Sequence, residues 1–205
     1  MANKVIDGDQ MTMVWHVDDL KVSHLKPLEI MKFACYLSHI FGPKLAVKRG
    51  NIHDYLGMDL DYSEKGQVKV SMIKYLKKIL AAFPEDLLST SNTPAARHLF
   101  TVHDDAKTEM LSEEEAMSFH HSVAQLLFMC SRSRRDVQLP VAFLTTRVKK
   151  PDVHDWGNLK RVMKYLNGTQ HMRLTLSAES LHCVRWWIDT YHTTPTRTVV
   201  DTMDP

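Results

Sequence analysis

Two adjacent carboxylates, Asp18 and Asp19, are the residues of this sequence best suited to chemistry. In the run Met11 to Val17, which precedes them, side chains alternate between two faces, and the short run LKVSH follows at once. This pattern predicts a β-hairpin with the two aspartates at its tip. Neighbouring residues of a regular strand point to opposite faces, so adjacent carboxylates can approach one ion only where the chain turns. At this tip they could share a hard divalent ion such as Mg²⁺ or Mn²⁺.

A simpler interpretation of the aspartate pair is conformational, since aspartate is a good turn residue that tolerates positive φ and bonds its own backbone. Against it stands the repulsion between two like charges placed side by side between apolar strands, which a nearby cation relieves. Both interpretations stay open on the residues alone.

Cationic side chains form two further candidate groups, one on each of two predicted amphipathic helices. Either group could follow a phosphate backbone, and either could simply be the solvated face of its helix. The residues are Lys74, Lys77 and Lys78 on the earlier helix and Lys160, Arg161 and Lys164 on the later one.

Charge is unevenly spread along the chain, although the net charge is only +2. Residues 84–115 hold eight acidic and two basic side chains, whereas residues 131–173 hold ten basic and three acidic ones, with a cluster at Arg132, Arg134 and Arg135. Such separation suits a protein that touches nucleic acid, because the local field attracts phosphates. Ordinary surfaces show the same separation, so the pattern leaves both possibilities open.

The elements that position these groups are expected as groups of short strands and groups of helices, which predicts an α+β fold. Pro27 opens a helix of roughly fifteen residues that ends at Gly42, with an apolar stripe of Leu28, Met31, Cys35 and Phe41. Extended runs are expected at 44–48, 55–62 and 68–70, followed by a helix over 72–83. Beyond a turn-rich stretch to residue 111, three helices are expected, one capped by Ser112 with Glu115, one capped by Asp136, and one over 152–166. Strands at 172–176 and 184–188 complete the pattern.

Composition excludes several classes of protein. The 205 residues are 44% hydrophobic with only seven glycines, which excludes collagen-like, low-complexity and disordered chains. No run approaches the roughly 18 apolar residues that cross a bilayer, and the first ten residues lack a signal peptide's hydrophobic segment. We therefore expect a cytoplasmic location, no secretion and no membrane partner. Three widely spaced cysteines fit neither a disulfide framework nor a structural zinc site.

In their sequences and in their order along the chain, these segments resemble the polymerase region of copia-type retrotransposon polyproteins, from the reverse transcriptase palm to the start of RNase H. VWHVDDLKVSH is similar to the family's x-x-Asp-Asp hairpin, and HDYLGMDLDYS to its Phe/Tyr-Leu-Gly strand. The pieces VKVSMIKYLKKIL, SNTPAARHL and FHHSVAQLLFMCSRSRRDVQLPVAFLTTRV are similar to its thumb, its Thr-Pro linker and its connecting helices. HDWGNLKRVMKYLNGT is close to the family's Trp-x-x-x-Lys-Arg-x-x-x-Tyr-Leu-x-Gly-Thr stretch and is the most distinctive piece. The resemblance covers about Met11 to Asp189.

Carried over by position, the resemblance implies an RNA-directed DNA polymerase in which Asp18 and Asp19 are metal ligands and two of the three polymerase carboxylates. Asp189 would be the first carboxylate of RNase H. The strand that positions the primer end would comprise Tyr55, Leu56 and Gly57. The implied chemistry is two-metal phosphoryl transfer with Mg²⁺ or Mn²⁺ on an RNA/DNA primer–template that is held chiefly through its phosphates.

The same resemblance implies four parts of the chain. A partial palm and thumb would occupy residues 1–83, an acidic linker or loop 84–111, and a helical connection 112–170. An incomplete RNase H-like sheet would begin in 171–205.

Departures from the family pattern limit what the chain is expected to do. The family's first metal-binding aspartate and its fingers precede the matched region, so we expect a fragment that is inactive alone and an upstream polymerase half as a partner. His16 stands where the family has an aromatic residue, and the pattern is lost after Asp189. Two alternatives stay open, a non-catalytic nucleic-acid-binding or assembly module and a degenerate remnant without function. The nucleus or a virus-like particle are the alternative locations.

Overall fold

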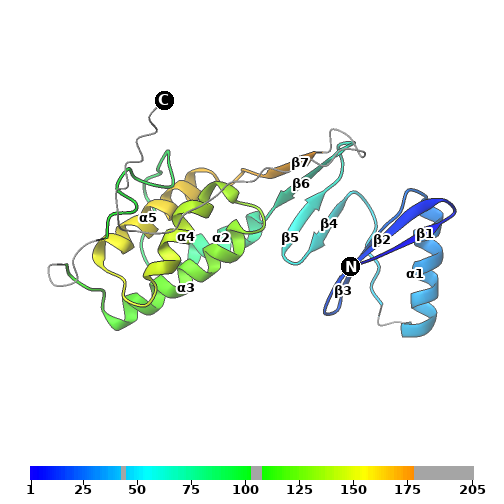
Figure 1. Ribbon diagram of the computed structural model, residues 1–205, viewed down its shortest axis with the longest axis horizontal. Coiled ribbons are helices and arrows are strands. Elements are labelled where there is room, and N and C mark those ends of the chain that lie inside the picture. The colour runs from blue at the N-terminus through cyan, green and yellow to red at the C-terminus, as the bar shows by residue number, and fades with distance from the viewer. Residues whose placement is uncertain (43–44, 103–107, 178–205) are drawn as a thin grey trace, which may run out of the picture. The chain divides into compact units, whose positions relative to one another are not determined.

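The computed structural model describes residues 1–42, 45–102 and 108–177. These residues form helices and antiparallel sheets, which confirms the predicted mixed α+β class (Figure 1). The chain divides into two compact units, the first made of residues 1–75 with 171–176 and the second centred on residues 76–170. The predicted strand 184–188 and Asp189 lie outside the described residues.

The first unit begins with a three-stranded antiparallel sheet of β1 (Ala2–Ile6), β2 (Asp9–His16) and β3 (Asp19–Ser23). The predicted hairpin is confirmed, because His16 pairs with Asp19 across a two-residue turn. Strand β1, which pairs with β2, was not predicted from the sequence, since its residues do not alternate clearly between apolar and polar types. Helix α1 (Pro27–Phe41) begins with Pro27 and ends at Gly42, as the sequence predicts.

A second sheet contains β4 (Ile52–Tyr55), β5 (Met58–Asp61), β6 (Gln67–Ser71) and β7 (Leu174–Ser177), in that order. The predicted continuous run over 55–62 is wrong, because Leu56 and Gly57 form a tight turn between β4 and β5 with φ of 53° and 74°. Two positive φ values are what a two-residue hairpin turn of type I′ requires. Residues 45–49 form no regular strand, so the run predicted for 44–48 is wrong over its described part.

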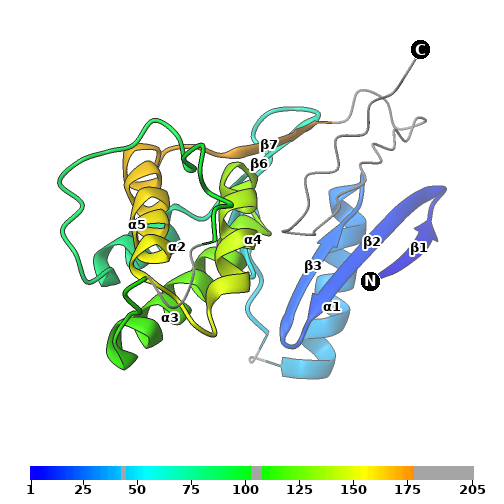
Figure 2. The same ribbon diagram turned by 60° about the vertical axis from the view of Figure 1, so that its left-hand side comes forward.

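Helices dominate the second unit (Figure 2). Helix α2 (Ile73–Ala82) leads into it, followed by α3 (Glu113–Cys130), the short 3₁₀ helix η2 (Arg135–Val137), α4 (Gln138–Arg147) and α5 (Val153–Gly168). The capping box of Ser112 and Glu115 is confirmed at the start of α3, and Asp152 with Asp155 forms a second one at α5. The predicted cap Asp136 is wrong: it lies within η2, and its carboxylate accepts hydrogen bonds from Arg134.

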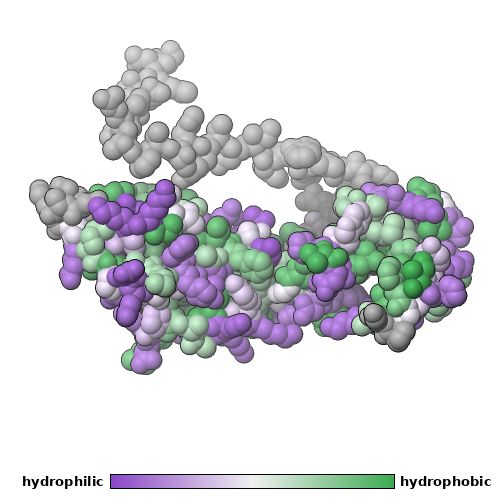
Figure 3. Space-filling view, turned by 90° about the horizontal axis from the view of Figure 1, so that it is seen from below, coloured by the Kyte–Doolittle hydropathy of each residue, from purple (hydrophilic) through white to green (hydrophobic). Residues whose placement is uncertain are grey.

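The two units differ in how much apolar surface they bury. Side chains of α3, α4 and α5 interlock in the second unit, where the fully buried residues include Phe119, Val123, Leu126, Leu144, Leu159, Met163 and Leu166. The first unit buries Met11, Leu60, Val70 and Met72, and α1 contributes no fully buried apolar residue. Its predicted stripe is wrong, since Leu28, Met31, Cys35 and Phe41 are exposed. Figure 3 shows apolar residues gathered at the surface of this part of the chain.

In the described part of the chain, no helix combines the length and apolar character needed to cross a bilayer.

Candidate functional site

The turn between β2 and β3 determines where the two candidate carboxylates lie. Val17 and Asp18 form the turn, and Asp19 is the first residue of β3. Val17 has a φ of 52° and is 89% exposed. A β-branched residue in the left-handed region is strained, and such strain persists mainly where a site requires it. The turn presents both carboxylates at an exposed tip, as the sequence predicts.

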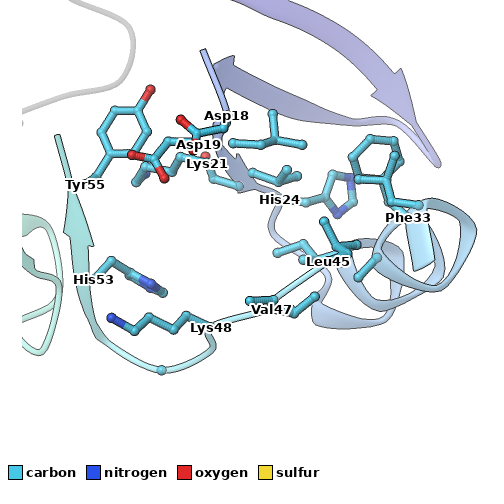
Figure 4. Close-up of a pocket in the computed structure, with 18 of the residues that line it drawn as sticks. Asp18, Asp19, Lys21, His24, Phe33, Leu45, Val47, Lys48, His53 and Tyr55 are labelled. Carbon is cyan, nitrogen blue, oxygen red and sulfur yellow. The ribbon is translucent and has the colours of Figure 1, made fainter. Parts of the chain in front are cut away.

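This tip forms one wall of a cleft of about 590 Å³ within the first unit. Figure 4 shows the ring of Tyr55 beside the Asp18 and Asp19 carboxylates, with His53 and Lys48 farther along the cleft. The opposite part is apolar and is built from β3, α1 and the segment 45–47. Its lining side chains are Leu20, Val22, Ile30, Phe33, Ala34, Leu37, Leu45, Ala46 and Val47. The cleft therefore combines an apolar part with the Asp18 and Asp19 carboxylates, lysine side chains and the aromatic ring of Tyr55.

Two polar atoms that belong to cleft-lining residues are buried without a hydrogen-bond partner in the described chain. They are the hydroxyl of Tyr55 and the Nε2 atom of His24. The other ring nitrogen of His24, Nδ1, accepts a hydrogen bond from the Lys26 backbone at 3.0 Å, which orients the imidazole. A buried polar atom without a partner costs free energy, so both atoms are suited to a ligand or to ordered water.

The predicted primer-positioning residues separate in the structure. Tyr55 ends β4 and lines the cleft, whereas Leu56 and Gly57 form the β4–β5 turn and are not part of the cleft lining. The ammonium of Lys21 lies 4.9 Å from the centre of the Tyr62 ring, a cation–π contact at the edge of the same cleft.

The hairpin tip offers two possible metal ligands, Asp18 and Asp19, and the question is whether a third side chain lies near them. Two carboxylates are hard oxygen donors of the kind that Mg²⁺ and Mn²⁺ prefer. Among the described residues, however, no group of three histidine, cysteine, aspartate or glutamate side chains is placed to hold one ion. Asp18 and Asp19 thus do not form such a group among the described residues, and Asp189 lies outside those residues.

The predicted cationic residues fall into two kinds. Lys77 and Lys78 are exposed on α2, and Lys74, also on α2, lies 3.5 Å from the carboxylate of Asp59 while its side chain stays largely in solvent. Lys160, Arg161 and Lys164 on α5 are half-buried. Lys160 pairs with Glu85, and Arg161 donates to Thr93, so these two side chains have partners within the protein.

Sequence reasoning missed several other polar residues of the cleft, among them His24, Lys48 and His53. Each stands alone in the sequence between unrelated neighbours, and only the packing of β3, β4 and the segment 45–50 brings them to one cleft. Histidine and lysine are residue types common in binding sites, but the spacing of these three residues matches no motif that would single them out.

Comparison with known proteins finds a similarity to a transposon protein. The chain is 24% identical over 179 residues to a protein of Saccharomyces cerevisiae named "Putative transposon Ty5-1 protein". The match covers 86% of this chain and 55% of the relative, so the chain spans about half the length of the relative it matches. No protein-family model matches the chain. No solved structure matches it significantly. The similarity supports a relation to a transposon protein.

Proposed function

We propose that this chain is part of a copia-type retrotransposon reverse transcriptase, and that its β2–β3 hairpin supplies two polymerase carboxylates. The observation that carries the proposal is the strained Val17–Asp18 turn, which presents Asp18 and Asp19 together at the rim of a cleft. The similarity to a transposon protein agrees with it. The resemblance supplies the activity, RNA-directed DNA synthesis on a primer–template.

Asp18 and Asp19 would act as oxygen ligands for Mg²⁺ or Mn²⁺. A bound divalent ion supplies charge stabilisation to phosphoryl transfer and lowers the pKa of the attacking hydroxyl. Among the described residues these two aspartates are not joined by a third ligand, so the proposal assigns the further carboxylate to an upstream polymerase half. The two aspartates hold their oxygens at the tip, and the ring of Tyr55 lies beside them in the same cleft.

Contact with the nucleic-acid backbone would fall chiefly to α2. Lys77 and Lys78 are exposed there, and Lys74 is mostly exposed, whereas the apolar stripe of α2 is buried. Such contacts depend on charge and not on sequence, so binding should weaken steeply with salt.

The experiment that tests the polymerase role is primer extension by a chimera. This chain is joined to the upstream half of a copia-type reverse transcriptase, which supplies the remaining carboxylate and the fingers. The chimera should extend a primer with Mg²⁺ or Mn²⁺, and Asp18→Asn or Asp19→Asn should abolish extension. Asp54→Asn, at an exposed aspartate of β4, is the matched control and should leave extension intact. Full activity of the Asp18→Asn and Asp19→Asn chimeras would refute the proposal.

The 205-residue chain alone should not extend a primer. Robust extension by the isolated chain, lost in Asp18→Asn, would show that the carboxylate set is complete without an upstream half.

A non-catalytic nucleic-acid-binding module is the second candidate, and the exposed lysines of α2 favour it. In that case duplex binding falls with Lys77→Gln and Lys78→Gln, while the chimera stays inactive whatever residues stand at 18 and 19.

A further inference from the structure

The segment 83–93, here called the strap, has no regular secondary structure, yet it is fixed along its length to α5. At its start, the ring of Phe83 stacks on Trp156 with a centroid distance of 5.6 Å and an interplanar angle of 18°. Further along, the side-chain amide of Asn167 donates to the Leu87 carbonyl at 3.1 Å. These contacts join residues far apart in sequence, so the strap is a docked segment of the second unit.

Glu85 is the polar centre of the strap. Its carboxylate accepts one hydrogen bond from the indole Nε1 of Trp156 and one from the ammonium of Lys160. Both charged side chains are only about a third exposed, at 32% and 35%. The Lys160 hydrogen bond, with help from Trp156, lowers the pKa of Glu85. The charge of Lys160 is therefore balanced inside the protein.

The end of the strap uses the next cation of α5. Arg161 donates through Nη2 to the hydroxyl of Thr93 at 2.8 Å and through Nε to the Thr93 carbonyl at 3.2 Å. The planar guanidinium thus grips one residue with two donors, a geometry that lysine cannot reproduce.

Close packing fixes a glycine at the end of α5. A Cβ atom on Gly168 would lie 3.0 Å from the Cβ of Thr90, closer than ordinary side-chain contacts. The backbone N–H of Ser91 also donates to the Lys164 carbonyl at 3.4 Å. The strap therefore lies against the α5 backbone itself here, where a larger residue would push it away.

We propose that Trp156, Lys160, Arg161, Asn167 and Gly168 form an intramolecular docking site for the strap, here called the α5 clasp. In this proposal, Lys160 and Arg161 fasten the strap and do not bind the phosphates of a nucleic acid. The clasp also ties the end of α2 to α5, because Phe83 directly follows that helix. All five clasp residues lie in the stretch HDWGNLKRVMKYLNGT and thereby share one structural role.

The test compares Lys160→Gln and Arg161→Gln with Lys164→Gln in the full chain. Lys164 is the control, because its carbonyl accepts a hydrogen bond from the strap while its ammonium acts on Glu85 only weakly, through its charge. Each clasp variant should lower Tm by about 2–4 °C, the shift expected for one lost interaction in a chain of this size. Thermolysin should also cut the strap several-fold faster at the exposed Leu88. Lys164→Gln should change both quantities much less than either clasp variant does.

Two further measurements decide between a clasp and a phosphate site. Glu85→Gln and Lys160→Gln combined should lower Tm by less than the sum of the single shifts, since both remove one pair. Affinity for a nucleic-acid duplex at low salt should fall with Lys77→Gln and Lys78→Gln but not with Lys160→Gln. The proposal is overturned if Lys160→Gln keeps the wild-type Tm and strap cleavage rate while duplex affinity falls. If Arg161→Gln fails to fold, Arg161→Lys keeps the charge without the two-donor grip and should still speed strap cleavage.

Discussion

Arg134 shows how a cation in the most basic part of the sequence is used inside the fold. Its side chain is only 4% exposed. The guanidinium donates to both carboxylate oxygens of Asp136 and to the carbonyl and hydroxyl of Thr169, at 2.7–3.3 Å. Burial opposes the ionisation of Asp136, but the hydrogen bonds and charge of Arg134, together with a hydrogen bond from Tyr165, leave the pKa of Asp136 lowered. Arg134 therefore joins η2 to the end of α5.

Replacing Arg134 should be far more costly than replacing its neighbour Arg135, which is exposed. Arg134→Met removes the charged partner of the largely buried Asp136 pair and the donor to the Thr169 carbonyl, so the free energy of unfolding should fall by about 2–4 kcal/mol. Arg135→Met should change it by less than about 0.5 kcal/mol. Urea unfolding at neutral pH measures both, and equal losses for the two variants would contradict the role given to Arg134.

Residue types alone could not separate these two arginines. The sequence groups Arg132, Arg134 and Arg135 as one basic cluster, since nothing in their spacing marks the buried one. The aspartates differ in this respect, because the alternation around Asp18 and Asp19 predicts a hairpin tip and the structure has one. A partner distant in sequence, such as Thr169 for Arg134, leaves no local signal.

At the scale of elements, local rules predict the helices better than the turns. Proline at the start and glycine after the end give the bounds of α1, and a capping box gives the start of α3. The β4–β5 turn was missed because leucine rarely adopts the positive φ that Leu56 has. The turn residues of the acidic stretch after α2 predict a linker or loop. Its docking on α5 could not be predicted, because it depends on pairs such as Glu85 with Lys160 that only the fold brings together.

The strap should make the stability of the protein depend on pH through Glu85. Because Lys160 and Trp156 lower the pKa of Glu85, its ionised form stabilises the fold above the unfolded value near 4.5. That contribution is lost as pH falls through the lowered folded pKa. Between about pH 6 and 3 the wild type should lose more stability than Glu85→Gln, by on the order of 1 kcal/mol or less because solvent screens the pair.

Melting curves at several pH values measure this difference. The contributions of the other acidic groups to the pH dependence cancel in the comparison, because the wild type and Glu85→Gln share those groups. Glu114→Gln, at an exposed glutamate of α3, should keep the wild-type dependence. Parallel curves for the wild type and Glu85→Gln would show that the Glu85 contact adds nothing to stability.

On the scale of the whole molecule, stability should be unequal between the two units. The second unit holds most of the fully buried apolar side chains, whereas the first rests on two small sheets and a sparsely buried helix. Regions with few buried apolar contacts open more readily. Backbone amides of α3 and α5 should therefore exchange hydrogen much more slowly than those of α1.

Leu159→Ala is the variant that tests this difference. Leu159 is fully buried in α5, so its truncation should cost about 2–5 kcal/mol and speed exchange in α3, α4 and α5. Leu28→Ala, at an exposed position of α1, should leave those rates unchanged. Equal acceleration across both units after Leu159→Ala would indicate a single cooperative unit instead.

Two cysteines in different environments allow the opening of the second unit to be followed by thiol labelling. Cys35 is exposed on α1, while Cys130 is buried in α3, where burial raises the pKa of its thiol. Thiolate is the form that reacts with maleimide dyes, so Cys35 can be modified in the native protein, whereas Cys130 stays protected until the helical unit opens. With Cys183 replaced by serine, the rate of the slow labelling step reads out the opening of the second unit without any added probe site.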